Sequence, residues 1–153
     1  MAEPAPAGGA FTVRMQRTVE WGDCDPAGII YYPTYYRWMD AASWALLAQA
    51  GFDAARMRAE QLTMPLVDAQ CSFVSSPTFG DECVVVSQVT RWGRTSFSVG
   101  HEVQRVAPPG EEPQVFARGS ESRVWCRYQS GPGSALRSEP MPAALRVALG
   151  GPA

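Results

Sequence analysis

Two aspartates, Asp23 and Asp25, stand close together in a loop that directly precedes a helical pattern. The loop spans Trp21 to Pro33 and is rich in glycine, proline and aromatic residues. A helix N-terminus has unpaired N–H groups and a partial positive charge, which can polarise a carbonyl. A carboxylate beside it could attack an acyl carbon or activate water. Judged from the loop alone, turn or capping roles for both aspartates are the simpler interpretation.

The rest of the composition offers few other catalysts. All 13 basic residues are arginine, which excludes Schiff-base enzymes and phosphate-binding loops that need a lysine. The single histidine, His101, excludes a multi-histidine metal site and lies inside a predicted strand, where a structural role is expected. Cys24 is a weak nucleophile because the aspartates on either side disfavour its thiolate. A serine-hydrolase elbow, Gly-x-Ser-x-Gly, is absent from the sequence.

Length and charge describe an ordinary globular protein. A chain of 153 residues predicts one domain, and a net charge of −2 predicts no binding to nucleic acid or membranes. Residues 1–10 are rich in alanine, glycine and proline and predict a disordered tail rather than a signal peptide. The cysteines are too widely spaced for a zinc site, so we expect reduced thiols in a cytoplasmic protein. They are Cys24, Cys71, Cys83 and Cys126.

The elements expected around this loop form an α+β pattern. One long helix is predicted over 34–50, between Pro33 and Gly51, and a weaker helical turn over 54–61. The expected strands cover 11–19, 66–74, 82–91, 96–106 and 114–128, and a short amphipathic segment covers 143–149. This order predicts an antiparallel sheet of about five strands wrapped around one central helix.

The long helix carries two different faces. The stripe expected to face the sheet consists of Tyr35, Trp38, Met39, Ala42, Ala45 and Leu46. The opposite face carries Asp40, Trp44 and Leu47 at helical spacing. Because Trp44 and Leu47 are apolar, we expect this face to contact another subunit.

The loop and the start of the helix resemble the motif of 4-hydroxybenzoyl-coenzyme A (CoA) thioesterases of the hotdog superfamily. The resembling residues are Gly22–Ile29, Tyr32, Pro33, Tyr35 and Arg37–Ser43. Weaker matches occur at Cys71–Phe73, Asp81, Trp92, Ser96 and Phe97. The resemblance implies a hotdog fold for residues 11–149, no cofactor or metal, and a homotetramer built as a dimer of dimers.

The resemblance also implies roles for four residues. Asp25 would attack the thioester or activate water, and the backbone N–H of Tyr32 would polarise the thioester carbonyl. Asp40 would contact the para-hydroxyl group of the substrate from a neighbouring subunit. Arg94 would bind a CoA phosphate, although the family carries several positive charges in this turn and Arg94 is the only one here. Asp23 is expected only to brace the loop.

The expected function is therefore hydrolysis of an aromatic acyl-CoA, with the small-molecule thioester as the partner. Arg91 and Arg123 are possible additional phosphate contacts. The segment Leu62–Pro65 departs from the family pattern near the expected ring pocket, which leaves the ring substituent open. Two alternatives remain: a hotdog thioesterase for aliphatic or phenylacetyl-type acyl groups, and a non-catalytic module that binds acyl-CoA.

Overall fold

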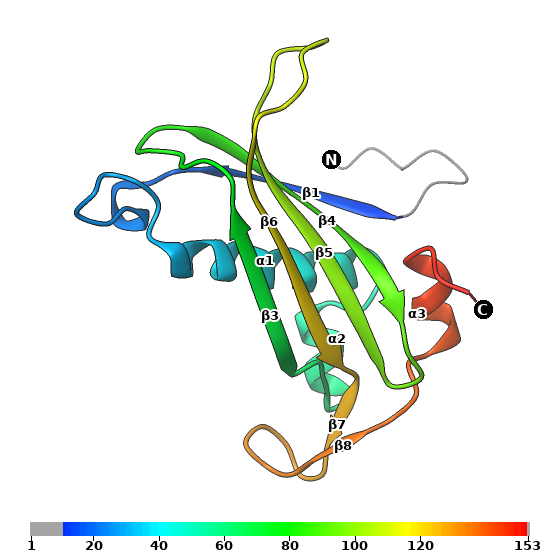
Figure 1. Ribbon diagram of the computed structural model, residues 1–153. Coiled ribbons are helices and arrows are strands. Elements are labelled where there is room, and N and C mark those ends of the chain that lie inside the picture. The colour runs from blue at the N-terminus through cyan, green and yellow to red at the C-terminus, as the bar shows by residue number, and fades with distance from the viewer. Residues whose placement is uncertain (1–10, 153) are drawn as a thin grey trace.

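The computed structural model describes residues 11–152, and its main feature is one long helix packed against a curved sheet (Figure 1). The tail predicted for residues 1–10 lies outside the described residues. The elements are β1 (Thr12–Thr18), a 3-10 helix (Trp21–Asp23), α1 (Tyr32–Gln49), α2 (Ala54–Ala59), β2 (Leu62–Thr63), β3 (Leu66–Phe73), β4 (Glu82–Trp92), β5 (Ser96–Arg105), β6 (Val115–Val124), β7 (Cys126–Tyr128), β8 (Leu136–Ser138) and α3 (Ala143–Ala148).

The main sheet has five antiparallel strands in the order β1-β4-β5-β6-β3, and it curves around α1 (Figure 1). Side chains of a strand alternate between its two faces. In β5 the alternation is regular, and Phe97, Val99, His101 and Val103 are all buried. The predicted plan of one sheet around one helix is confirmed.

The face of α1 that was expected to meet the sheet is buried, apart from the partly buried Ala45. The helix approaches the sheet closely at Gly119 of β6, where a methyl group would overlap the sulfur of Met39. The helix starts at Tyr32, two residues before the predicted start, because proline is compatible with the first helical turn. It ends at Gln49, and Gly51 follows with a φ of 85°.

The prediction that Leu47 contacts another subunit is wrong. Leu47 is fully buried and belongs to the same core cluster as Phe52 and Met57. The chain folds back after α1, and this return covers the outer face of the helix near its end. Trp44 is partly buried because it packs against the same cluster of its own subunit.

The strand predicted over 114–128 is divided in two. It breaks at Trp125, whose side chain is fully buried and whose amide donates to the Thr95 carbonyl at 2.7 Å. After this break, β7 forms a second sheet with the short strands β2 and β8, in the order β2-β7-β8. Among residues 11–152, no helix is long and apolar enough to cross a bilayer.

Candidate functional site

The loop before α1 is a small hairpin closed by backbone hydrogen bonds. The amide of Asp25 donates to the Ile29 carbonyl at 3.0 Å, and the amide of Gly28 donates to the Asp25 carbonyl at 2.9 Å. Gly28 has a φ of 79°, a conformation that favours glycine. Bridges from Cys24 to Ile30 and from Ile29 to Thr78 hold the hairpin in place. The loop is therefore a rigid support for the side chains that it carries.

The carboxylate of Asp25 is held in one orientation and remains accessible. One of its oxygens, Oδ1, accepts a hydrogen bond from the Ala27 amide at 2.8 Å. The residue is partly exposed, and no ion pair engages it within residues 11–152. Such a carboxylate can act as a nucleophile or a base without first breaking a salt bridge.

The N-terminus of α1 presents one free amide at the end of this loop. Pro33 has no N–H, and the Thr34 amide donates to the Tyr31 carbonyl at 2.9 Å. The Tyr32 amide has no backbone acceptor elsewhere in the described chain. It therefore lies at the positive end of the helix dipole with its hydrogen available to a ligand oxygen.

Asp23 has the bracing role that was predicted. It is buried, and one carboxylate oxygen accepts from the Glu20 amide at 3.0 Å while the other pairs with Arg37 at 2.7 Å. Its carbonyl accepts from the Tyr31 amide at 2.8 Å. These bonds connect both arms of the hairpin to α1, so Asp23 supports the loop and is not free to react.

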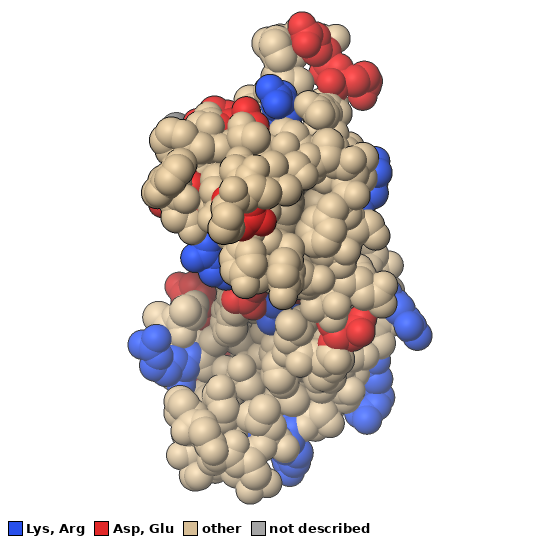
Figure 2. All heavy atoms as spheres, turned by 60° about the vertical axis from the view of Figure 1, so that its left-hand side comes forward, with Lys and Arg blue, Asp and Glu red and all other residues tan. Residues whose placement is uncertain are grey.

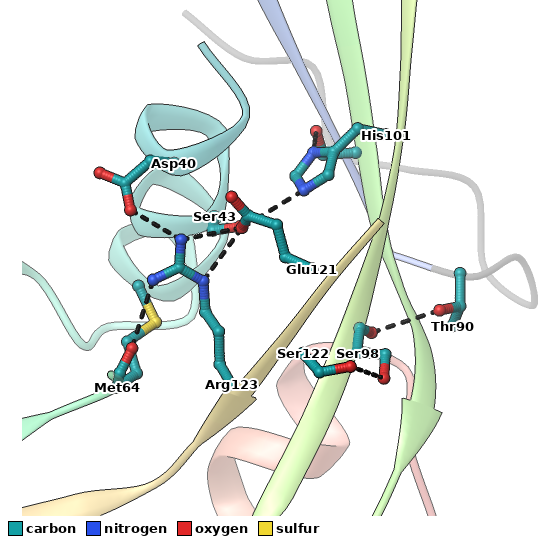
Figure 3. A network of polar contacts seen from close by, with 10 residues as sticks. Asp40, Ser43, Met64, Thr90, Ser98, His101, Glu121, Ser122 and Arg123 are labelled. Atoms are coloured by element: carbon teal, nitrogen blue, oxygen red, sulfur yellow. Dashed lines mark hydrogen bonds and ion pairs between the residues drawn. The ribbon is translucent and has the colours of Figure 1, made fainter. Parts of the chain in front are cut away.

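Asp40 lies further along α1, where a polar network connects the helix to β6 (Figure 3). Its Oδ1 accepts from Nη2 of Arg123 at 2.6 Å, and its side chain remains 54% exposed. Arg123 also contacts Glu121 at 2.8 Å, and the hydroxyl of Ser43 donates to Glu121 at 2.6 Å. The network thus extends from a buried carboxylate to a carboxylate at the surface.

Glu121 is ionised although it is almost fully buried. Burial by itself raises the pKa of this carboxyl group. His101 and Ser43, which approach its oxygen, and the positive charge of Arg123 outweigh burial and lower the pKa to about 2. Sequence reasoning missed this network. The signal available was the spacing of Glu121 and Arg123, which places both on the inward face of one strand.

His101 is a buried strand residue, as predicted, and only one of its ring nitrogens is satisfied. Its Nδ1 shares a hydrogen bond of 2.7 Å with the Ser87 hydroxyl. Its Nε2 has no hydrogen-bond partner among residues 11–152 and lies 3.5 Å from the Glu121 carboxylate (Figure 3). Its polar contacts among the described residues are with Ser87 and Glu121, and neither belongs to the loop that carries Asp25.

The expected phosphate contacts have different surroundings. Arg94 is exposed in the turn between β4 and β5, and its carbonyl accepts from the Met141 amide at 3.3 Å. Arg91 is exposed at the end of β4. The suggestion that Arg123 binds phosphate is wrong, because its side chain is 3% exposed and its guanidinium is already paired with two carboxylates.

One subunit does not bring all the predicted site residues together. The loop with Asp25 and Tyr32 is tied to the start of β4, since the Val19 amide donates to the Asp81 carbonyl. The turn with Arg94 follows the other end of β4, an 11-residue strand that spans roughly 30 Å. Figure 1 shows the two regions at opposite ends of the sheet.

The surface around the loop and along β3 carries several exposed apolar side chains. Figure 2 shows this side of the molecule, where mostly uncharged surface surrounds a hollow in which acidic and basic side chains meet. The large apolar residues exposed in the loop and along β3 are Trp21, Tyr31, Tyr32, Leu66, Val67 and Phe73. Apolar surface of this extent is typical of an interaction site.

All four cysteines are unpaired, and the thiol pKa is raised in three of them. Burial raises the pKa of Cys71, and burial with the nearby acids Asp81 and Glu82 raises that of Cys83 to about 12. Cys126 is also buried and has a raised pKa. These thiols stay protonated near neutral pH and cannot compete with a carboxylate.

Comparison with known proteins identifies relatives over almost the whole chain. The profile of the thioesterase-like superfamily matches residues 19–149. The 4-hydroxybenzoyl-CoA thioesterase of Pseudomonas sp. strain CBS-3 is 34% identical over 137 residues, which cover 88% of this chain and 94% of that protein.

Solved structures confirm the hotdog fold. A variant of 4-hydroxybenzoyl-CoA thioesterase bound to 4-hydroxybenzoyl-CoA superposes with a TM-score of 0.81 and 33% identity, covering 92% of this chain and 99% of the other. A gentisyl-CoA thioesterase gives a TM-score of 0.75 and 29% identity, covering 88% and 99%. The profile match and these relatives show that the chain belongs to the thioesterase-like superfamily.

Proposed function

We propose that this protein hydrolyses an aromatic acyl-CoA, of which 4-hydroxybenzoyl-CoA is the leading candidate, to the free acid and CoA. The observation that carries the proposal is the oriented, accessible carboxylate of Asp25 in a loop that ends at the free Tyr32 amide. The names of two relatives agree with this substrate class, since 4-hydroxybenzoyl-CoA and gentisyl-CoA are both thioesters of hydroxylated benzoic acids.

The chemistry follows from these two groups. The thioester carbonyl oxygen would accept the Tyr32 N–H, so that negative charge developing on it is stabilised by the helix N-terminus. Asp25 would either add to the carbonyl carbon and form a mixed anhydride that water then hydrolyses, or remove a proton from the attacking water. In both routes the C–S bond breaks, the sulfur leaves as the CoA thiolate and takes up a proton, and water supplies the oxygen of the acid.

The loop with Asp25 and the turn with Arg94 lie at opposite ends of the sheet in one subunit, which suggests that a complete site needs more than one subunit. We propose a homotetramer made of two dimers, in which Asp40 and Arg94 serve an acyl-CoA held by the loop of a neighbouring subunit. The free edge of β3, with its exposed apolar side chains, is a suitable surface for pairing two sheets. Light scattering coupled to size-exclusion chromatography would measure the mass. A monomer with full activity would contradict this assembly.

The unpaired thiols are consistent with a cytoplasmic location, where thiols remain reduced. This location also agrees with a CoA substrate. No step of the proposed reaction requires a metal or prosthetic group.

A thiol-release assay over a panel of acyl-CoA thioesters tests the function. The panel would contain 4-hydroxybenzoyl, benzoyl, gentisyl, phenylacetyl, butyryl and octanoyl thioesters at equal concentrations. The proposal predicts the highest kcat/KM for a hydroxylated benzoyl thioester. A preference for the aliphatic thioesters would change the substrate class, and binding without release of CoA would indicate a non-catalytic module.

A further inference from the structure

The guanidinium of Arg123 is the central group of the network between α1 and the sheet (Figure 3). Its Nε and Nη2 donate to one oxygen of Glu121 at 3.0 and 2.8 Å, and its Nη1 donates to the Met64 carbonyl at 3.2 Å. Nη2 also donates to Asp40 at 2.6 Å. Each of the three guanidinium nitrogens therefore has a hydrogen-bond acceptor other than Asp40.

Glu121 is fixed in turn by its neighbours. The Ser43 hydroxyl donates to it at 2.6 Å, and the Nε2 atom of His101 lies 3.5 Å away. The charged groups that face Arg123 are thus Glu121 from its own strand and Asp40 from α1, with His101 of β5 behind Glu121. Because Glu121 is 1% exposed, these contacts leave it little freedom to move.

Asp40 differs from the rest of the network because half of its side chain reaches the surface. An aspartate on an exposed helix face normally samples several rotamers and is surrounded by water. Here one oxygen is bound to a buried cation, which restricts the rotamer of the side chain. The other oxygen makes no contact with a described residue and can accept a hydrogen bond from a ligand.

We propose that Arg123 is a positioning residue for substrate selection: by holding the Asp40 carboxylate in one orientation, it sets the preference for acyl groups that carry a hydroxyl at the far end of the ring. This inference rests on the proposed function. Arg123 itself does not touch the substrate and acts only through Asp40.

The test is the selectivity ratio, the kcat/KM for 4-hydroxybenzoyl-CoA divided by that for benzoyl-CoA. Both values come from one enzyme preparation, so the ratio does not depend on the fraction of a variant that is folded. A hydroxyl bound to a carboxylate makes a strong hydrogen bond, and Asp40→Asn should lower the ratio about tenfold. Arg123→Met should lower it several-fold, mainly through a higher KM for the hydroxylated substrate.

Arg123→Lys and Arg118→Met serve as matched comparisons. Lysine retains the positive charge but cannot make all the contacts of the guanidinium, so its ratio should lie between those of the wild type and Arg123→Met. Arg118 is on the same strand, points away from α1 and pairs with Glu102 at 3.0 Å. Its replacement should leave the ratio unchanged.

The decisive comparison places Arg123→Met in an Asp40→Asn background. If Arg123 acts through Asp40, the second substitution changes the ratio no further. An equal drop in both backgrounds, or no drop in either, would overturn the inference while the proposed function stands. If the wild type hydrolyses neither thioester, the proposed function has failed and the inference fails with it.

Discussion

Replacing Glu121 by glutamine removes one charge from the buried network and keeps the size of the side chain. The carboxylate accepts hydrogen bonds from Ser43 and Arg123 and is 1% exposed. Its pKa is about 2 in the folded protein, against an ordinary value of 4.5. Because ionisation is favoured in the folded state, the charged carboxylate stabilises the fold.

The size and pH range of this stabilisation follow from the two pKa values. Their difference corresponds to about 3 kcal/mol in the free energy of unfolding. The folded pKa is the lower one, so the stabilisation is complete above about pH 4.5 and is lost as the pH falls toward 2. In this range it decreases by about 1.4 kcal/mol per pH unit.

Urea unfolding at a series of pH values measures this effect at fixed protein concentration. At pH 7 the Glu121→Gln variant should be less stable than the wild type by about 3 kcal/mol. The difference should shrink by about 2 kcal/mol between pH 4.5 and pH 3. Glu60→Gln is the control, since Glu60 is 43% exposed and forms an ion pair with Arg56 on the same surface, and its effect should stay below about 0.5 kcal/mol.

A stability difference between the wild type and Glu121→Gln that is constant from pH 7 to pH 3 would refute this reasoning. It would mean that Glu121 takes up its proton at the same pH in the folded and unfolded chains. The network would then contribute no charge-dependent stability.

Three further predictions concern packing, loop bracing and thiol reactivity. Gly119→Ala should lower the free energy of unfolding by about 1–3 kcal/mol in urea titration, because its methyl group meets α1, whereas Gly22→Ala, with open space around it, should change little. Asp23→Ala should cost about 2 kcal/mol and reduce kcat, because it leaves a backbone amide of the loop unpaired. Arg37→Met should cost less than about 1 kcal/mol, since Arg37 is largely exposed; equal losses for both variants would contradict this account. Cys83, with a pKa of about 12, should react with a disulfide reagent only after unfolding, and rapid labelling of the native protein would be inconsistent with its burial.

The elements that follow a clear periodicity were predictable from the sequence. The helix stripe around Met39 and the alternation in β5 both reflect the burial of one face, which a sequence pattern records directly. The division at Trp125 was not predictable in this way, because a buried tryptophan fits the core of one continuous strand equally well. Leu47 was misassigned because the covering segment around Met57 comes from a later part of the chain.

The candidate site shows the same difference between local and long-range information. The bracing role of Asp23 follows from its place in a tight loop, and the structure confirms it. The environment of Asp40 cannot be predicted from its own helix, because its partner Arg123 lies 83 positions away in the sequence. A pattern along the chain cannot reveal that contact before the fold places β6 against α1.

The most direct test of the thioesterase assignment is a single-turnover experiment with excess enzyme and 4-hydroxybenzoyl-CoA. Asp25→Asn is compared with the wild type and with Asp23→Asn, a neighbouring carboxylate that only braces the loop. We predict that Asp25→Asn folds, binds the thioester and releases CoA at least about 10³-fold more slowly, whereas Asp23→Asn keeps a much larger share of the rate. An Asp25→Asn enzyme that releases CoA at a near-normal rate would contradict the catalytic role of Asp25.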